Sequence, residues 1–292
     1  MPNSLIRKAQ FTFWKYAEGR AVFEFQSFYL FRSLLRKLPK GDGHPVIVFP
    51  GFVSSDLATR PMRGLFRDLG YSTYGWGLGR NLMVDHKREQ KMRNLLRNVY
   101  KKEGRKVSLI GWSLGGVFAR EVAKANPEYV RCVITMGSPI SGDLHHSSAK
   151  DLFSAINGDP SEGANENYRH INEPPPVPTT SIYSRTDGIV QWEGSVQHDA
   201  PLTENIEVPA SHLGLGFNPF VMLVVADRLA QAEGQWKKFD PSGLKRLIYR
   251  TPVSKSAKQT ASEDEKVPEE VASETRAETG LIPQVFKRVM GS

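Results

Sequence analysis

The chain has 292 residues, of which 39% are apolar, and a formal net charge of +8 at pH 7. That length is sufficient for the core of one α/β domain, and the single cysteine, Cys132, excludes a disulfide within the monomer. The basic excess would suit nucleic acid, but no known nucleic-acid-binding motif accompanies it, so we expect no nucleic-acid partner.

Residues 1–40 are predicted to form an N-terminal helical extension. The run Phe11 to Leu38 lacks proline and spaces its apolar residues as in one long helix or two. It packs over the core, or it acts as an interfacial anchor on an anionic lipid surface, because aromatic and basic residues are dense here. With no signal peptide and no apolar run of about 20 residues, we expect a cytoplasmic protein, and in the anchor alternative its membrane contact is peripheral.

Strands and helices are predicted to alternate after Gly41. A buried strand, His44 to Phe49, ends in Pro50-Gly51-Phe52 and is followed by the predicted helix Arg60 to Leu69, the strand Tyr71 to Trp76 and the helix Asp85 to Glu103. This alternation indicates a parallel sheet. Arg80 and Asn81 follow the second strand and are candidates to border a pocket at the carboxyl ends of the strands.

The stretch Gly111-Trp112-Ser113-Leu114-Gly115-Gly116 lies between the strand Val107 to Ile110 and a predicted helix. Strand, G-x-S-x-G turn and helix in this order are typical of a nucleophile elbow, where glycines permit close approach of strand and helix. We therefore predict that Ser113 is a nucleophile. The N–H of Leu114, at the start of the helix, is a candidate oxyanion donor.

The second half of the chain supplies three further predicted strands and a helix: Arg131 to Met136, Thr179 to Ser184, Ile206 to Val208, and Phe220 to Ala232. Residues 140–178 break the pattern, and we interpret them as a small cap insertion over the site within a domain of residues 41–252. Residues 253–292 are poor in large apolar side chains and are expected to form a disordered tail.

A carboxylate and a histidine follow two of these strands. Asp187 comes just after Thr179 to Ser184, and His212 comes after Ile206 to Val208. A serine hydroxyl needs a positioned base, and that base needs a carboxylate to fix its tautomer. Two rival pairs are weaker candidates: His198-Asp199, which lies in a loop, and His145-His146 in the cap.

The order serine, acid, histidine and the segments Pro-Gly-Phe, Gly-Trp-Ser-Leu-Gly-Gly, Ser-x-x-Asp-Gly-Ile-Val and Ser-His-Leu-Gly resemble those of lipases and esterases of the α/β-hydrolase superfamily. The resemblance covers roughly residues 44 to 232. It implies an α/β-hydrolase fold with a mainly parallel sheet flanked by helices, here with reduced N-terminal strands. It also implies a triad of Ser113, Asp187 and His212, with the N–H groups of Phe52 and Leu114 as the oxyanion hole.

The expected activity is hydrolysis of a carboxylic ester or lipid with an apolar part, contacted by Trp112, Trp76 and Phe153. Two alternatives remain open: acyl transfer to an alcohol or lipid acceptor, and a non-catalytic binding module with the same fold. No histidine and carboxylate cluster has the spacing of a zinc site, so we expect no metal and no cofactor.

Overall fold

The computed structural model describes residues 12–82, 86–141 and 171–251, and these residues belong to one compact unit. Its centre is a six-stranded sheet in the order β2-β1-β3-β4-β5-β6, in which every neighbouring pair is parallel. The strands are β1 (Pro45–Phe49), β2 (Ser72–Gly75), β3 (Val107–Trp112), β4 (Val130–Met136), β5 (Thr179–Tyr183) and β6 (Thr203–Glu207). Each predicted strand is therefore confirmed, and the shared direction brings all the carboxyl ends to one edge.

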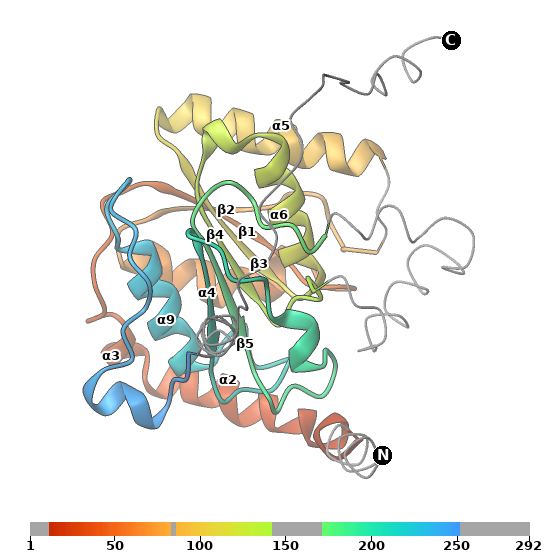
Figure 1. The fold of residues 1–292 in the computed structure, drawn as a ribbon, viewed down its shortest axis with the longest axis vertical. Helices are drawn as coiled ribbons and strands as arrows, with labels where there is room; N and C mark the ends of the chain where they lie inside the picture. Colours follow the sequence, from red (N-terminus) through yellow and green to blue (C-terminus); the bar gives the residue numbers. More distant parts are fainter. Residues whose placement is uncertain (1–11, 83–85, 142–170, 252–292) are drawn as a thin grey trace, which may run out of the picture. The chain divides into compact units, whose positions relative to one another are not determined.

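Helices cover both faces of the sheet (Figure 1). They are η1 (Ala17–Arg20), α2 (Ala21–Leu30), α3 (Arg32–Leu35), α4 (Asp56–Asp68), α5 (His86–Glu103), α6 (Leu114–Ala125), η2 (Pro127–Tyr129), η4 (Trp192–Ser195), α9 (Pro219–Leu229) and η5 (Gly243–Leu247). Helix α4 begins four residues before the predicted start at Arg60. Ser55 caps it by accepting a hydrogen bond from the N–H of Leu57 (3.4 Å), and Pro61 lies in its second turn instead of its first.

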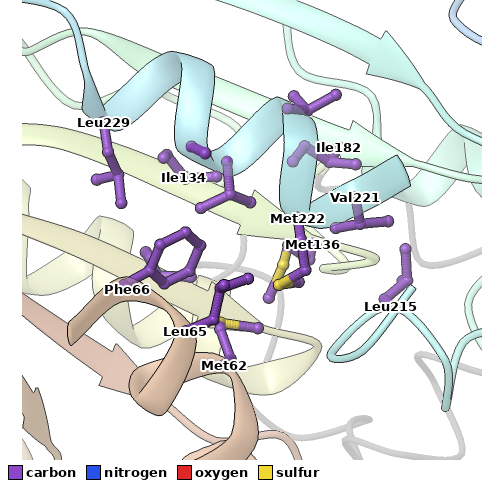
Figure 2. Packing of buried hydrophobic residues seen from close by; sticks show 14 of the residues in the cluster. Met62, Leu65, Phe66, Ile134, Met136, Ile182, Leu215, Val221, Met222 and Leu229 are labelled. Atoms are coloured by element: carbon purple, nitrogen blue, oxygen red, sulfur yellow. The ribbon is translucent and has the colours of Figure 1, made fainter. Parts of the chain in front are cut away.

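The buried apolar residues form two clusters, one on each face of the sheet. Helices α5 and α6 pack on one face, where Leu96 and Phe118 are buried against strand residues such as Leu109. On the other face, Leu65 and Phe66 of α4 meet strand residues and the side chains of α9 (Figure 2). This three-layer packing fixes the strand ends that carry the candidate site.

The N-terminal segment is helical over residues 12–16 and continues through η1, α2 and α3. Phe28 and Leu35 are buried in the same cluster as α4 and α9, so this segment packs on the core. Within the described ranges, no helix combines the length and apolar character needed to cross a bilayer.

The predicted cap is described only at its two ends, because residues 142–170 lie outside the described residues. At the first end, the N–H groups of Ile140 and Ser141 donate to the carbonyl of Gly194 (2.7 and 2.9 Å). At the second, the buried guanidinium of Arg120 donates to three carbonyls of residues 171–173, the shortest bond being to Glu173 (2.9 Å). The predicted tail, 253–292, also lies outside the described residues.

Candidate active site

Ser113 occupies the turn between β3 and α6 in a backbone conformation that only glycine adopts readily, with φ 54° and ψ −126°. Among the described residues, the other non-glycine residue with positive φ is Val53 (φ 61°). Ser113 is held there by its N–H, which donates to the carbonyl of Met136 (2.8 Å). A strained backbone conformation of this kind is kept only where surrounding contacts hold it in place, and such residues are often found at functional sites.

The glycines of this turn are required by close approach, as predicted from the motif. A Cβ atom on Gly111 would lie 2.2 Å from Cα of Gly116, and one on Gly115 would lie 2.3 Å from the carbonyl oxygen of Phe49. Any side chain at either position would force α6 away from the sheet. The elbow geometry thus follows from the sequence pattern.

Asp187 and His212 are paired directly, with 2.7 Å between Oδ2 of Asp187 and Nδ1 of His212. The other carboxylate oxygen, Oδ1, accepts from the N–H groups of Ile189 and Val190 (both 2.8 Å), which fixes the orientation of the carboxylate. Asp187 is 3% exposed and His212 is 4% exposed. With Asp187 as the acceptor, Nδ1 of His212 is the donor in this pair, and Nε2 is the ring nitrogen that can act as a base.

The elbow and the histidine loop are joined by a hydrogen bond and lie at the same strand end. The indole N–H of Trp112 donates to the carbonyl of His212 (3.1 Å). At the end of β4, a Cβ atom on Gly137 would lie 3.0 Å from Oδ2 of Asp187 and 3.2 Å from Nδ1 of His212. Because the N–H of Ser113 bonds to Met136, the residue before this glycine, the three predicted triad residues gather around the same strand end.

The loop after β1 also lies close to Ser113. A Cβ atom on Gly51 would lie 3.2 Å from Cβ of Ser113, which places the next residue, Phe52, beside the predicted nucleophile. Leu114 is the first residue of α6, so its N–H has no acceptor within the helix. The two predicted oxyanion donors therefore flank Ser113.

Asn81 anchors this loop, in a role that the sequence did not reveal. Its side-chain amide donates to the carbonyl of Pro50 (2.9 Å), its carbonyl accepts from the N–H of Val53 (2.7 Å), and its N–H donates to the carbonyl of Ser54 (2.8 Å). Asn81 is fully buried. It holds the strained Val53 turn in place instead of bordering an open pocket.

The pKa of His212 lies above its ordinary value. Burial by itself lowers this pKa, but the charge of Asp187, the hydrogen bond to Asp187 and the charge of Glu18 outweigh burial. The imidazolium that forms when a base takes up a proton is thus stabilised by two carboxylates.

Glu18 of η1 connects the two loops that carry the acid and the histidine. Its Oε1 accepts from the N–H groups of Gly188 (2.8 Å) and His212 (2.9 Å), and its Oε2 accepts from the N–H of Leu213 (3.0 Å). Glu18 is 7% exposed. Nothing in the sequence pattern pointed to it, because its partners lie 170 and more residues away.

Two further residues of the same segment support these loops. Glu24 accepts from the N–H of Ser211 (3.0 Å) and from the side-chain amide of Asn218 (2.9 Å). Arg20 donates to the hydroxyl of Thr186 (2.9 Å) and to the carbonyl of Ala210 (3.0 Å). The N-terminal helices therefore hold the residues on both sides of the Asp187–His212 pair.

We expect Glu18→Gln to lower kcat/KM for an ester by about ten- to a hundredfold, because it disturbs the position of His212. The acid limb of the pH profile should also move to lower pH. A neutral His212 is the base, so activity rises as pH passes its pKa, and losing the Glu18 charge lowers that pKa.

The matched control is Glu24→Gln, which removes a carboxylate from the same helical segment but not one that bonds to His212. Its acid limb should stay in place. An acid limb that is the same in Glu18→Gln and wild type would contradict an electrostatic role for Glu18.

The two tryptophans predicted to contact the substrate are buried in the structure. Trp76 is 1% exposed and donates its indole N–H to the carbonyl of Gly79 (2.9 Å). Trp112 is 6% exposed and packs edge-on against Phe217 at 5.6 Å between ring centroids. Both indoles are core side chains, since each buries its ring and satisfies its N–H within the protein. Phe153 lies outside the described residues.

The exposure and the contacts of the rival pair His198-Asp199 do not fit a catalytic role. Both residues are exposed, and Asp199 forms an ion pair with Lys238 at 3.1 Å. Neither has the burial or the strand-end position of the Asp187–His212 pair. The other rival, His145-His146, lies outside the described residues.

A second arrangement of aspartate, histidine and serine lies near the amino ends of β1 and β3. Nδ1 of His44 is 2.5 Å from Oδ1 of Asp42, and its Nε2 is 2.8 Å from Oγ of Ser108. His44 and Ser108 are fully buried, and burial is the main cause that lowers the pKa of His44 to about 4. Because Ser108 lies within a central strand with no access for a substrate, this set serves to satisfy buried polar groups.

The parallel sheet and the elbow together define the α/β-hydrolase fold. Among solved structures, Aspergillus fumigatus lipase B is 18% identical with a TM-score of 0.55, over 72% of this chain and 58% of that one. Bacillus licheniformis lipase BlEst2 in its mature form is 17% identical with a TM-score of 0.50, over 66% of this chain and 94% of that one. At such identities the similarity establishes the fold, and the chain spans less than two thirds of lipase B. No family profile and no curated protein sequence matches the chain.

Proposed function

We propose that the protein is a serine hydrolase that cleaves carboxylic esters with an apolar part. The observation that carries this proposal is the strained Ser113 at the β3–α6 turn (φ 54°), whose neighbour Trp112 bonds to the carbonyl of a histidine that is itself paired to a buried carboxylate. Glycine would adopt this backbone conformation without strain, so a serine in its place is best explained by the chemistry of its hydroxyl.

In the proposed mechanism, Oγ of Ser113 attacks the ester carbonyl carbon while Nε2 of His212 takes the hydroxyl proton. The resulting oxyanion accepts hydrogen bonds from the N–H groups of Phe52 and Leu114. Collapse of this intermediate breaks the bond to the alcohol, which leaves with the proton from His212. Water then attacks the acyl-enzyme with His212 as base, which releases the acid and restores Ser113.

The preference for an apolar ester is supported by the side chains next to the site. Val53 follows the predicted oxyanion donor and is 48% exposed, and Leu213 follows His212 and is 46% exposed. Both provide apolar surface at the rim of the site. The two similar solved structures are those of lipases, which agrees with this substrate class.

The test is labelling of the full chain with a fluorophosphonate probe, together with turnover of p-nitrophenyl esters of increasing acyl length. We expect one adduct on the tryptic peptide of residues 107–120, which contains both Ser108 and Ser113, and fragmentation should place it on Ser113. Turnover should increase from acetate to longer acyl chains. A folded protein that is neither labelled nor active on any of these esters would contradict the proposal.

A further inference from the structure

The N-terminal helical segment, residues 12–35, buries Phe28 and Leu35 in the core, but the rest of it differs from an ordinary surface helix. Its carboxylates face the protein, where Glu18 and Glu24 accept hydrogen bonds from backbone N–H groups of the site loops. Large apolar side chains face outward instead. Six of them are 60–85% exposed, and together we name them the outer face: Phe13, Tyr16, Val22, Phe23, Leu30 and Leu34.

Six large apolar side chains exposed on one helical segment require an explanation. A surface helix usually buries its apolar stripe and exposes its charges. Within α2, Phe23 (69% exposed) and Leu30 (77% exposed) lie two turns apart, so they share one side of the helix. Helix α2 lies at the periphery of the described structure (Figure 1). Clustered apolar side chains on such a helix indicate an interaction surface.

The charges near the outer face select an anionic partner. Residues 12–40 contain two carboxylates, Glu18 and Glu24, and both are directed inward. Lys15 of this segment is exposed, and so are Lys37 and Lys40, which follow the segment directly in the chain. The exposed acid next to the segment, Asp68 of α4, is paired with Arg32 and Arg36. Aromatic and aliphatic side chains combined with lysines, and without exposed acids on the helix itself, are typical of helices that lie in the interface of an anionic membrane.

We propose that the outer face binds the surface of an anionic lipid membrane. The inner side of the same segment bonds to Gly188 and His212 at 2.8 and 2.9 Å, so membrane binding would hold the loops of the candidate site next to the lipid. The binding itself does not depend on the chemistry proposed for Ser113.

The experiment is sedimentation of the full chain with vesicles of phosphatidylcholine, with and without phosphatidylglycerol, using Ser113→Ala so that no lipid is consumed. We expect binding to the anionic vesicles and weak binding to the neutral ones. Adding Phe23→Ser and Leu30→Ser together should lower the partition coefficient by about tenfold or more. Adding Lys15→Glu and Lys37→Glu should abolish the preference for phosphatidylglycerol.

The matched control is Leu202→Ser, which removes an exposed leucine (40% exposed) from the loop before β6 and should leave vesicle binding unchanged. Thermal unfolding of each variant checks the fold, and the exposed positions should shift the Tm by no more than a few degrees. Equal binding of the Phe23/Leu30 variant and the parent to anionic vesicles would overturn the proposal. So would a folded chain that binds neither vesicle, or one whose outer face mediates self-association instead.

Discussion

Ser113→Ala is expected to lower the turnover of p-nitrophenyl esters by about 10⁴- to 10⁶-fold. Alanine keeps the Cβ atom, so the elbow at φ 54° and its hydrogen bond to Met136 stay as they are, and only the nucleophile is lost. The variant would still bind the ester and would still have both oxyanion donors. Some rate above that of the uncatalysed reaction should therefore remain. Steady-state kinetics over the ester series measures the effect.

The control for this variant is Ser108→Ala, five residues earlier in β3. That serine is bonded to His44 and is fully buried, so its loss should lower stability by about 1–3 kcal/mol and leave kcat/KM close to wild type. If Ser108→Ala abolished turnover in a folded protein while Ser113→Ala retained it, the assignment of the nucleophile would be wrong.

Asp187→Asn is expected to lower kcat/KM by about 10⁴-fold. Oδ1 of Asp187 accepts two backbone N–H groups, so the oxygen of asparagine would stay there and its NH₂ group would face Nδ1 of His212. The imidazole would then accept at Nδ1 and carry its proton on Nε2, where it cannot take a proton from Ser113. Loss of the carboxylate charge should also lower the pKa of His212 and move the acid limb of the residual activity to lower pH.

Asp199→Asn provides the matched control for Asp187→Asn. It makes the same chemical change at an exposed aspartate that pairs with Lys238, and exposed pairs contribute about 1 kcal/mol or less. Its pH profile and kcat/KM should equal those of wild type. A loss of less than about tenfold in Asp187→Asn would show that His212 does not depend on this carboxylate.

The N-terminal helices give the protein two faces with different tasks in our proposals. The inner side, with Glu18, positions the loops around the Asp187–His212 pair. The outer side offers apolar and basic residues to a lipid surface. Because one short helical segment carries both, vesicle binding and ester turnover can be varied separately by substitutions on its two sides.

The order of the strands and helices could be predicted from the sequence, and so could the elbow. Both depend on local patterns: apolar runs for the buried strands, the 3.6-residue period for the helices, and the glycines that let α6 approach β1. The positions of Asp187 and His212 followed as well, because the loops after neighbouring parallel strands meet at one edge of the sheet.

Only the tertiary structure decided which polar groups are paired and which aromatic rings are buried. Trp76 and Trp112 were predicted to contact the substrate, but both rings are buried, and Trp112 packs against the distant Phe217, which periodicity cannot reveal. The local sequence around Glu18 does not indicate its partners, because the backbone N–H groups that it accepts belong to residues 170 to 195 positions away. Local pattern determines the elements and the ends of the strands. The hydrogen-bond partners of buried polar groups come from segments that are distant in the sequence. Which segments meet is decided only by the tertiary packing.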